Sequence, residues 1–109
     1  SAETANTWKL SDSHTLVVKN MLTLRQAGPT NSQLLTASLP DSATNININL
    51  RITYKGISQV NEYQLTDLRD DFFLNYGREI DKIEITGSCT LSGTIHSFNE
   101  VISVDYTNN

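Results

Sequence analysis

Three aspartates lie close together in the sequence, at Asp67, Asp70 and Asp71. A calcium ion prefers several carboxylate oxygens as ligands, so such a cluster can in principle hold one. The spacing lacks the alternating acidic residues and the final glutamate of an EF-hand loop. If this segment is helical, a solvated first turn explains the three carboxylates without any ion. We therefore predict no metal site, although the sequence alone leaves calcium binding by these aspartates open.

A cysteine nucleophile would require Cys89, the single cysteine of the chain. His96 is expected to lie opposite Cys89 on a hairpin, and a thiolate–imidazole pair is the starting point of thiol catalysis. However, the sequence identifies neither an orienting third group nor oxyanion donors, and Cys89 shares its expected strand face with apolar residues. His14 follows a serine and an aspartate in residues 11–14, but neighbours within one turn cannot converge as a triad. We predict no catalytic residue and no enzymatic activity.

The charge and the composition argue against several classes of partner. The chain of 109 residues has a formal net charge of −4, and no two of its 8 Lys and Arg residues are adjacent. Nucleic-acid binding requires a cationic stripe that neutralises phosphates, so we expect no nucleic-acid partner. The longest apolar runs contain three residues, so we expect no membrane insertion. Because no glycine-rich phosphate loop is present, we expect no cofactor.

Threonine, serine and asparagine are unusually common, with 13, 11 and 11 copies. This polar but weakly charged composition favours an exported or surface-displayed protein. With a single cysteine, no intramolecular disulfide can form. We therefore expect a secreted or cell-surface location.

Two amphipathic aromatic residues are candidate ligand contacts. Trp8 lies near the N-terminus, and Tyr76 lies where an expected helix returns to a strand. Exposed aromatic rings stack on sugar faces or anchor protein partners. Packing in the core or at its rim is the alternative for both rings.

A row of amides is the third candidate. Asn45, Asn47 and Asn49 alternate with apolar residues in the segment 45–54, which places them on the wet face of an expected strand. Asparagine is a poor strand former, so its repeated use on one face asks for a reason. Paired amide donors and acceptors can bind polyols or an adjoining strand. A neutral, soluble sheet face is the alternative interpretation.

The elements that must position these residues are mostly strands, because the apolar residues alternate with a period of two. The pattern predicts a hairpin that joins residues 45–54 to residues 57–65 through a two-residue turn at Lys55–Gly56. It predicts further strands at residues 7–10 and 35–39, and one bent strand or two strands within residues 15–25.

A second hairpin is expected at the end of the chain, with Ser92–Gly93 as its turn. This register pairs Cys89 with His96 and places Phe98 over Gly87, which has no side chain. It also brings Glu100 beside an isoleucine, and we expect a β-bulge near Asn99–Glu100 to relieve that contact.

One segment departs from the alternating pattern. Leu65, Leu68, Phe72 and Tyr76 follow one another at spacings of three and four residues. Aspartates suit the first turn of a helix, and Gly77 suits its C-terminal end. We predict one short helix near residues 66–76. The fold class predicted from these patterns is an all-β, antiparallel two-sheet β-sandwich of about seven strands, with residues 1–109 forming a single domain.

The function that these observations favour is a non-catalytic binding module, exported or surface-displayed, that recognises a carbohydrate or a protein ligand, for example in adhesion. The alternative is a structural or assembly subunit, such as a fibre, pilus or coat component, that forms a homo-oligomer by self-association through sheet edges. A small hydrolase or thiol enzyme is the least favoured class.

Overall fold

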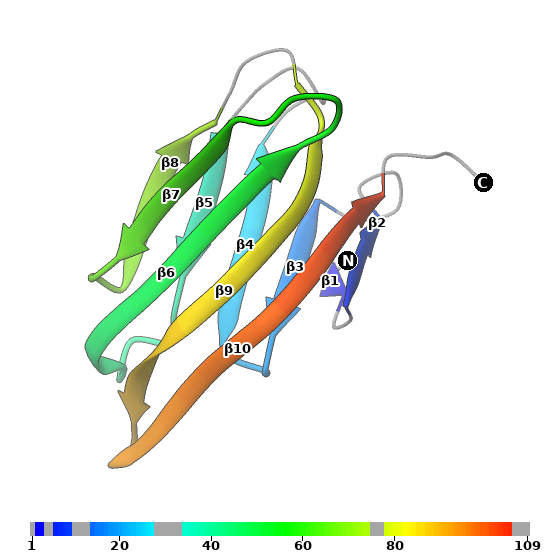
Figure 1. Ribbon diagram of the computed structural model, residues 1–109. Coiled ribbons are helices and arrows are strands. Elements are labelled where there is room, and N and C mark those ends of the chain that lie inside the picture. The colour runs from blue at the N-terminus through cyan, green and yellow to red at the C-terminus, as the bar shows by residue number, and fades with distance from the viewer. Residues whose placement is uncertain (1, 4–5, 10–13, 28–33, 75–77, 106–109) are drawn as a thin grey trace.

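The computed structural model of the chain describes residues 2–3, 6–9, 14–27, 34–74 and 78–105. These residues form ten strands in two sheets of five (Figure 1). The all-β class and the two-sheet, sandwich-like arrangement are therefore confirmed. The expected number of about seven strands is wrong. Residues 15–27 form two strands, and residues 2–3 and 69–73 form two further strands at the edges of one sheet.

Sheet A has the strand order β1-β3-β4-β5-β8. Its strands are β1 (Ala2–Glu3), β3 (Thr15–Val18), β4 (Leu22–Ala27), β5 (Leu34–Ser38) and β8 (Arg69–Phe73). Neighbouring strands are antiparallel, except that β1 runs parallel to β3. The β3–β4 turn places both Lys19 and Asn20 at positive φ, 54° and 59°, as in a type I′ turn.

Sheet B has the strand order β2-β10-β9-β6-β7. Its strands are β2 (Thr7–Lys9), β6 (Thr44–Tyr54), β7 (Val60–Leu65), β9 (Ile80–Leu91) and β10 (Thr94–Asp105). Here too the neighbours are antiparallel, except that β2 runs parallel to β10. The inward-facing residues of both sheets form one hydrophobic core, in which Trp8, Leu24, Leu35, Ile48 and Ile83 are fully buried.

The register predicted for the last hairpin is confirmed. Ten residue pairs run without interruption from Thr94 opposite Leu91 to Ser103 opposite Lys82. The bulge expected near Asn99–Glu100 is wrong, because Glu100 lies directly opposite Ile85 in this continuous ladder. Glu100 is only half-buried, so its carboxylate can reach water without a break in the strand.

Gly87 fixes the position of β9 against β6. Its φ is +107°, and a Cβ atom on it would lie 2.1 Å from the backbone oxygen of Asn47. Any side chain at this position would therefore force the two strands apart. Phe98 lies opposite Gly87 in the register, as predicted.

The first hairpin is confirmed, but its predicted two-residue turn is wrong. Thr53 pairs with Val60, so the connection runs from Lys55 to Gln59. Two contacts explain the longer loop. The Lys55 backbone N–H donates to the Glu79 carbonyl oxygen at 2.9 Å, and Ile57 packs against the core.

The predicted helix near residues 66–76 is also wrong, because residues 69–73 form the edge strand β8 and residues 75–77 lie outside the described part of the chain. The helix-like spacing has another origin. Leu65 faces the core from β7, Leu68 lies in the crossover between the sheets, and Phe72 faces the core from β8. Three elements thus contribute one apolar residue each, and pairing with β5 satisfies the backbone of this segment.

Candidate functional site

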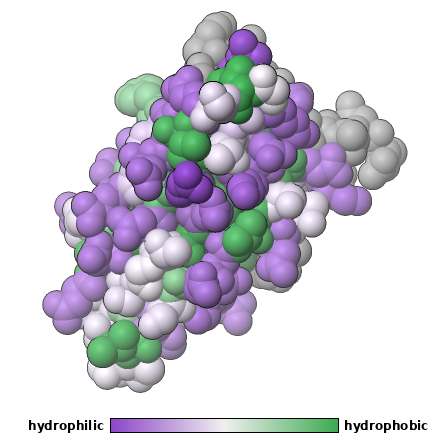
Figure 2. All heavy atoms as spheres, in the orientation of Figure 1, coloured by the Kyte–Doolittle hydropathy of each residue, from purple (hydrophilic) through white to green (hydrophobic). Residues whose placement is uncertain are grey.

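The outer surface of sheet B carries a level array of amide and hydroxyl groups. We define this polar face by six outward-facing residues of β6, β9 and β10: Asn47, Asn49, Thr86, Ser88, Ser97 and Asn99. The register aligns them in two rows, one from Asn47 through Ser88 and one from Asn49 through Thr86. Figure 2 views the molecule from this side, where hydrophilic residues predominate and hydrophobic residues form separate spots.

Ladder geometry sets the spacing of this array. Neighbouring strands lie about 4.8 Å apart, and outward residues on one strand repeat at about 6.8 Å. Asn47 is anchored, because its Oδ1 accepts a hydrogen bond of 2.6 Å from Gln64 Nε2 on β7. The array ends at an ion pair in which Arg51 Nη1 lies 3.1 Å from Glu84 Oε1. The polar face can thus offer both donors and acceptors without net charge.

The structure separates the three predicted amides. Asn47 and Asn49 are exposed and lie on the polar face, as the alternation predicted. Asn45 is exposed too, but it has a φ of 49° and lies where the register between β6 and β9 shifts by one residue. A bulge residue in the left-handed region favours asparagine for conformational reasons, so the residue type of Asn45 needs no ligand to explain it.

The two aromatic candidates do not join this array. Trp8 has no exposed surface and belongs to the core, so its ring is not on the surface to stack on a ligand. Tyr76 lies outside the described residues. The alternation Thr7, Trp8, Lys9 indicated a strand, but the sequence did not reveal which face of it is buried.

Cys89 and His96 lie opposite each other, as the register predicted. The thiol is buried and its Sγ lies 4.0 Å from Met21 Sδ, in apolar surroundings. Burial raises the pKa of the Cys89 thiol above its ordinary value, which makes it a poor nucleophile near neutral pH. This environment fits a structural rather than a reactive cysteine.

The aspartate cluster is spread along the β8 segment. Asp70 Oδ1 accepts a hydrogen bond of 2.8 Å from the Asp71 backbone N–H, and Asp71 Oδ1 accepts one of 2.8 Å from Thr36 Oγ1. Within the described ranges, no three His, Cys, Asp or Glu side chains gather closely enough to hold a metal ion.

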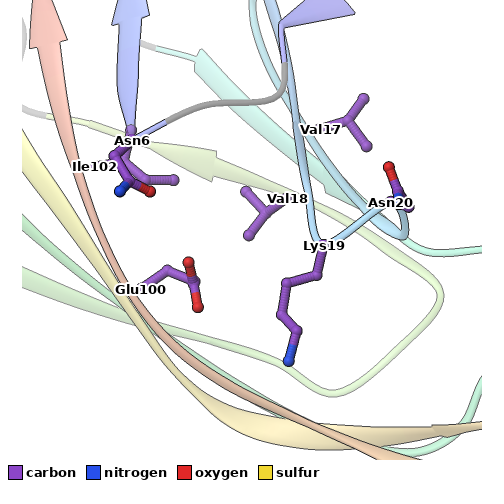
Figure 3. Close-up of a pocket in the computed structure, with 7 residues that line it drawn as sticks. All are labelled: Asn6, Val17, Val18, Lys19, Asn20, Glu100 and Ile102. Carbon is purple, nitrogen blue, oxygen red and sulfur yellow. The ribbon is translucent and has the colours of Figure 1, made fainter.

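A hollow of about 340 Å³ opens between the sheets, on the side where β3 faces β10. Its lining comprises Asn6, Val17, Val18, Lys19, Asn20, Glu100 and Ile102, and we call it the side hollow. Figure 3 shows Glu100 and Ile102 on one flank and Val18 and Lys19 on the other. Lys19 Nζ donates a hydrogen bond of 2.6 Å to the Ser97 carbonyl oxygen and lies 5.7 Å from the centroid of the Phe98 ring. Lys19 therefore ties the two sheets together at this opening.

A second hollow, of about 160 Å³, lies on the outer surface of sheet A. It is lined by Thr23, Arg25, Thr36, Ser38 and Arg69, and we call it the arginine hollow. No local sequence signal points to this hollow, because Arg25 and Arg69 lie far apart in the chain and meet only through the strand order β4-β5-β8.

One polar side chain lies in the core. Gln26 on β4 is 2% exposed, and neither its Nε2 nor its Oε1 has a hydrogen-bond partner among the described residues. The described contacts give no reason for an amide at this position.

The described residues contain no helix of the length and apolar character needed to cross a lipid bilayer. No protein-family model, no curated protein and no solved structure matches the chain at a level that would support a relationship.

Proposed function

We propose that the protein is a single-domain, non-catalytic binding module, exported or displayed at a cell surface, and that it recognises a carbohydrate ligand through the polar face of sheet B. The observation that carries this proposal is the alignment of six uncharged hydrogen-bonding side chains on three adjacent strands.

A hydroxyl-rich ligand matches this surface chemically. Amide groups donate and accept at once, and the hydroxyls of Thr86 and Ser88 rotate to do either. Because rigid strands hold the groups in place, little conformational entropy is lost when a ligand is bound. A sugar chain laid across the two rows would exchange its water contacts for several such hydrogen bonds.

The test is titration calorimetry against a panel of neutral polysaccharides, with xylan, glucan, mannan and chitin oligomers as the actual probes. The double variant Asn49→Ala/Thr86→Ala removes one amide and one hydroxyl from the centre of the face. We expect about tenfold weaker binding, since each lost hydrogen bond contributes about 1 kcal/mol or less.

Thr66→Ala is the matched control, because Thr66 is exposed but lies in the crossover after β7, away from the polar face. Unchanged affinity of the control beside weakened binding of the double variant would support the proposal. If no glycan binds the wild-type protein, or if both variants bind equally well, the polar face is not the carbohydrate site. A screen against protein ligands would then follow.

The second candidate function is an assembly subunit that self-associates through a sheet edge, and it has its own supporting observation. β2 pairs only with the last three residues of β10, Ser103–Asp105. Among the described residues, the stretch Thr94–Ile102 therefore has a strand neighbour only on its β9 side. Light scattering over about a hundredfold range of concentration separates the candidates, because mass grows with concentration for an assembling subunit and stays constant for a monomeric module.

A further inference from the structure

The arginine hollow brings together two guanidinium groups and three hydroxyl groups on the outer surface of sheet A. The register sets Thr23, Ser38 and Arg69 side by side in one row across β4, β5 and β8. In the adjacent row, Arg25 lies beside Thr36. The two arginines therefore occupy opposite corners of the hollow, and the hydroxyl groups lie between them.

Neither arginine is neutralised within the described part of the chain. The ion pairs found there join Arg51 to Glu84, at 3.1 Å, and Lys55 to Glu79, at 3.9 Å. Arg25 and Arg69 are exposed, and no carboxylate belongs to the lining of the hollow. Among the described residues, no carboxylate pairs with either of these outward-facing arginines, whereas Arg51 on the opposite sheet is paired with Glu84.

The geometry points to an oxyanion-binding site: Arg25 and Arg69, with the hydroxyls of Thr23 and Ser38, bind one carboxylate or sulfate group of an acidic carbohydrate. Guanidinium groups present planar forks of N–H donors that match the oxygen pairs of such groups. The site itself follows from the hollow, whereas the carbohydrate nature of the ligand rests on the proposed function.

The overall charge favours one anionic group at a time over a polyanion. The chain has a net charge of −4, and its cationic residues are scattered singly. A long polyanion would meet repulsion beyond the hollow, whereas a single carboxylate or sulfate contacts only the two arginines. A hollow of about 160 Å³ accommodates one small anionic group.

Asp71 lies next to the site and opposes it. It pairs with Thr36 in the register, and its Oδ1 accepts the Thr36 hydroxyl at 2.8 Å. The Thr36 hydroxyl hydrogen is therefore already used, and the carboxylate repels an incoming anion. Removing the Asp71 charge should tighten anion binding, which is the opposite of the effect expected when the arginine charges are removed.

The experiment is an NMR titration of the whole chain with sodium sulfate and with a galacturonate trimer, here a trisaccharide of two galactose units and one galacturonate, at constant ionic strength held by sodium chloride. A neutral galactose trimer is the third ligand. We expect saturable shifts confined to the amides of residues 23–25, 36–38 and 69–71, with dissociation constants on the order of 1 mM for an exposed two-point site. Tighter binding of the galacturonate trimer than of sulfate identifies the carbohydrate as the ligand, whereas equal binding reduces the site to one for free anions and overturns that part of the proposal.

The double variant Arg25→Gln/Arg69→Gln should weaken anion binding by about tenfold or more, and Asp71→Asn should strengthen it several-fold. Arg51→Gln and Glu84→Gln are the controls on sheet B: Glu84→Gln makes the same charge change as Asp71→Asn, and Arg51→Gln removes one of the two positive charges that the double variant removes. Both controls should retain wild-type affinity. Arg25→Lys/Arg69→Lys serves as a second variant, which keeps the charge, loses the planar fork and should bind with intermediate affinity.

Wild-type protein without localised shifts, or a double glutamine variant that binds as well as wild type, would overturn the oxyanion site. Equal weakening by Arg51→Gln would also overturn it, since net charge alone would then explain the effect. These outcomes are independent of Asn49 and Thr86, so a failure of this site and a failure of the polar face can be told apart.

Discussion

The two lateral sides of the molecule are built in different ways. On one side, the edge strands β7 and β8 of the two sheets contact each other, and both lie at the left of Figure 1. The rings of Tyr63 and Phe72 lie 5.1 Å apart there, and Tyr63 Oη donates a hydrogen bond of 2.6 Å to the Phe73 carbonyl oxygen. On the other side, below β2, the side hollow stays open and Lys19 alone spans it among the described contacts.

This difference shows two ways of handling a sheet edge. At the closed side, a tyrosine hydroxyl occupies an edge carbonyl, and Asn61 Nδ2 in turn donates to Tyr63 Oη at 2.8 Å. At the open side, charged side chains protect the edge. Lys19 donates a hydrogen bond to the Ser97 carbonyl oxygen, and Glu100 occupies an inward-facing position of β10. Inward-pointing charges and lysines are known protections against edge-to-edge pairing. We infer that the closed side contributes more to stability and the open side more to solubility.

The largest expected effect is at the closed side. Phe72→Ala should lower the free energy of unfolding by about 3–5 kcal/mol, because it removes a buried ring and leaves a cavity beside Tyr63. Urea denaturation monitored by tryptophan fluorescence measures the change. A loss below about 1 kcal/mol would mean that the closed side is not the stable one.

Tyr63→Phe should have a smaller effect, a loss of about 1 kcal/mol, because it deletes the hydroxyl but keeps the ring. The Phe73 carbonyl can then turn to water, which limits the loss. A double-mutant cycle with Asn61→Ala isolates the coupling of the two side chains. An unfolding free energy equal to wild type would show that the hydrogen bond to Phe73 contributes nothing.

At the open side, Lys19 affects stability in two opposite ways: its side-chain contacts stabilise the fold, and its positive φ destabilises it. Lys19→Met removes the hydrogen bond to Ser97 and the cation–π contact, and should cost about 0.5 kcal/mol. Lys19→Gly removes the same contacts but relieves a positive φ worth about 1 kcal/mol, so it should be at least as stable as wild type. If Lys19→Gly is instead less stable than wild type, the contacts of Lys19 between the sheets outweigh the backbone strain.

The smallest effect concerns association. Glu100→Val removes the inward-facing charge of β10 and should leave the monomer stable, with self-association detectable only at the highest concentrations by light scattering. Glu62→Val is the matched control, because Glu62 is an exposed glutamate on β7, the edge strand of the closed side. Association of the control but not of Glu100→Val would reverse the comparison between the two sides.

Local pattern predicted part of this architecture well. The β9–β10 register followed from one turn and the alternation around Phe98, because a two-residue turn leaves little freedom in pairing. The helix near residues 66–76 failed because Leu65 and Phe72 face one core from two different sheets, which imitates a helical period. The burial of Trp8 depended on a parallel pairing with β10 that no local signal encodes.

The candidate sites also divide into one that local alternation predicts and one that depends on the sheet order. Asn47 and Asn49 were placed correctly because strand alternation alone decides which face they occupy. The meeting of Arg25 with Arg69 depends on β8 pairing with β5 after the chain has crossed to the other sheet and back. Such a meeting is a property of the sheet order, which the spacing of residues along the chain does not contain.

The parallel pairing of β2 with β10 also bears on how the molecule responds to tension. Near its two ends the chain is joined by three residue pairs, Thr7 with Ser103, Trp8 with Val104 and Lys9 with Asp105. A pull directed backwards on the start of β2 and forwards on the end of β10 loads these pairs together, in shear, whereas an antiparallel hairpin opens one pair at a time from its end. Rupture under such a pull is governed by the rate of unfolding rather than by equilibrium stability. A protein held in this way between two surfaces should resist a high force and then lose all three pairs in one step.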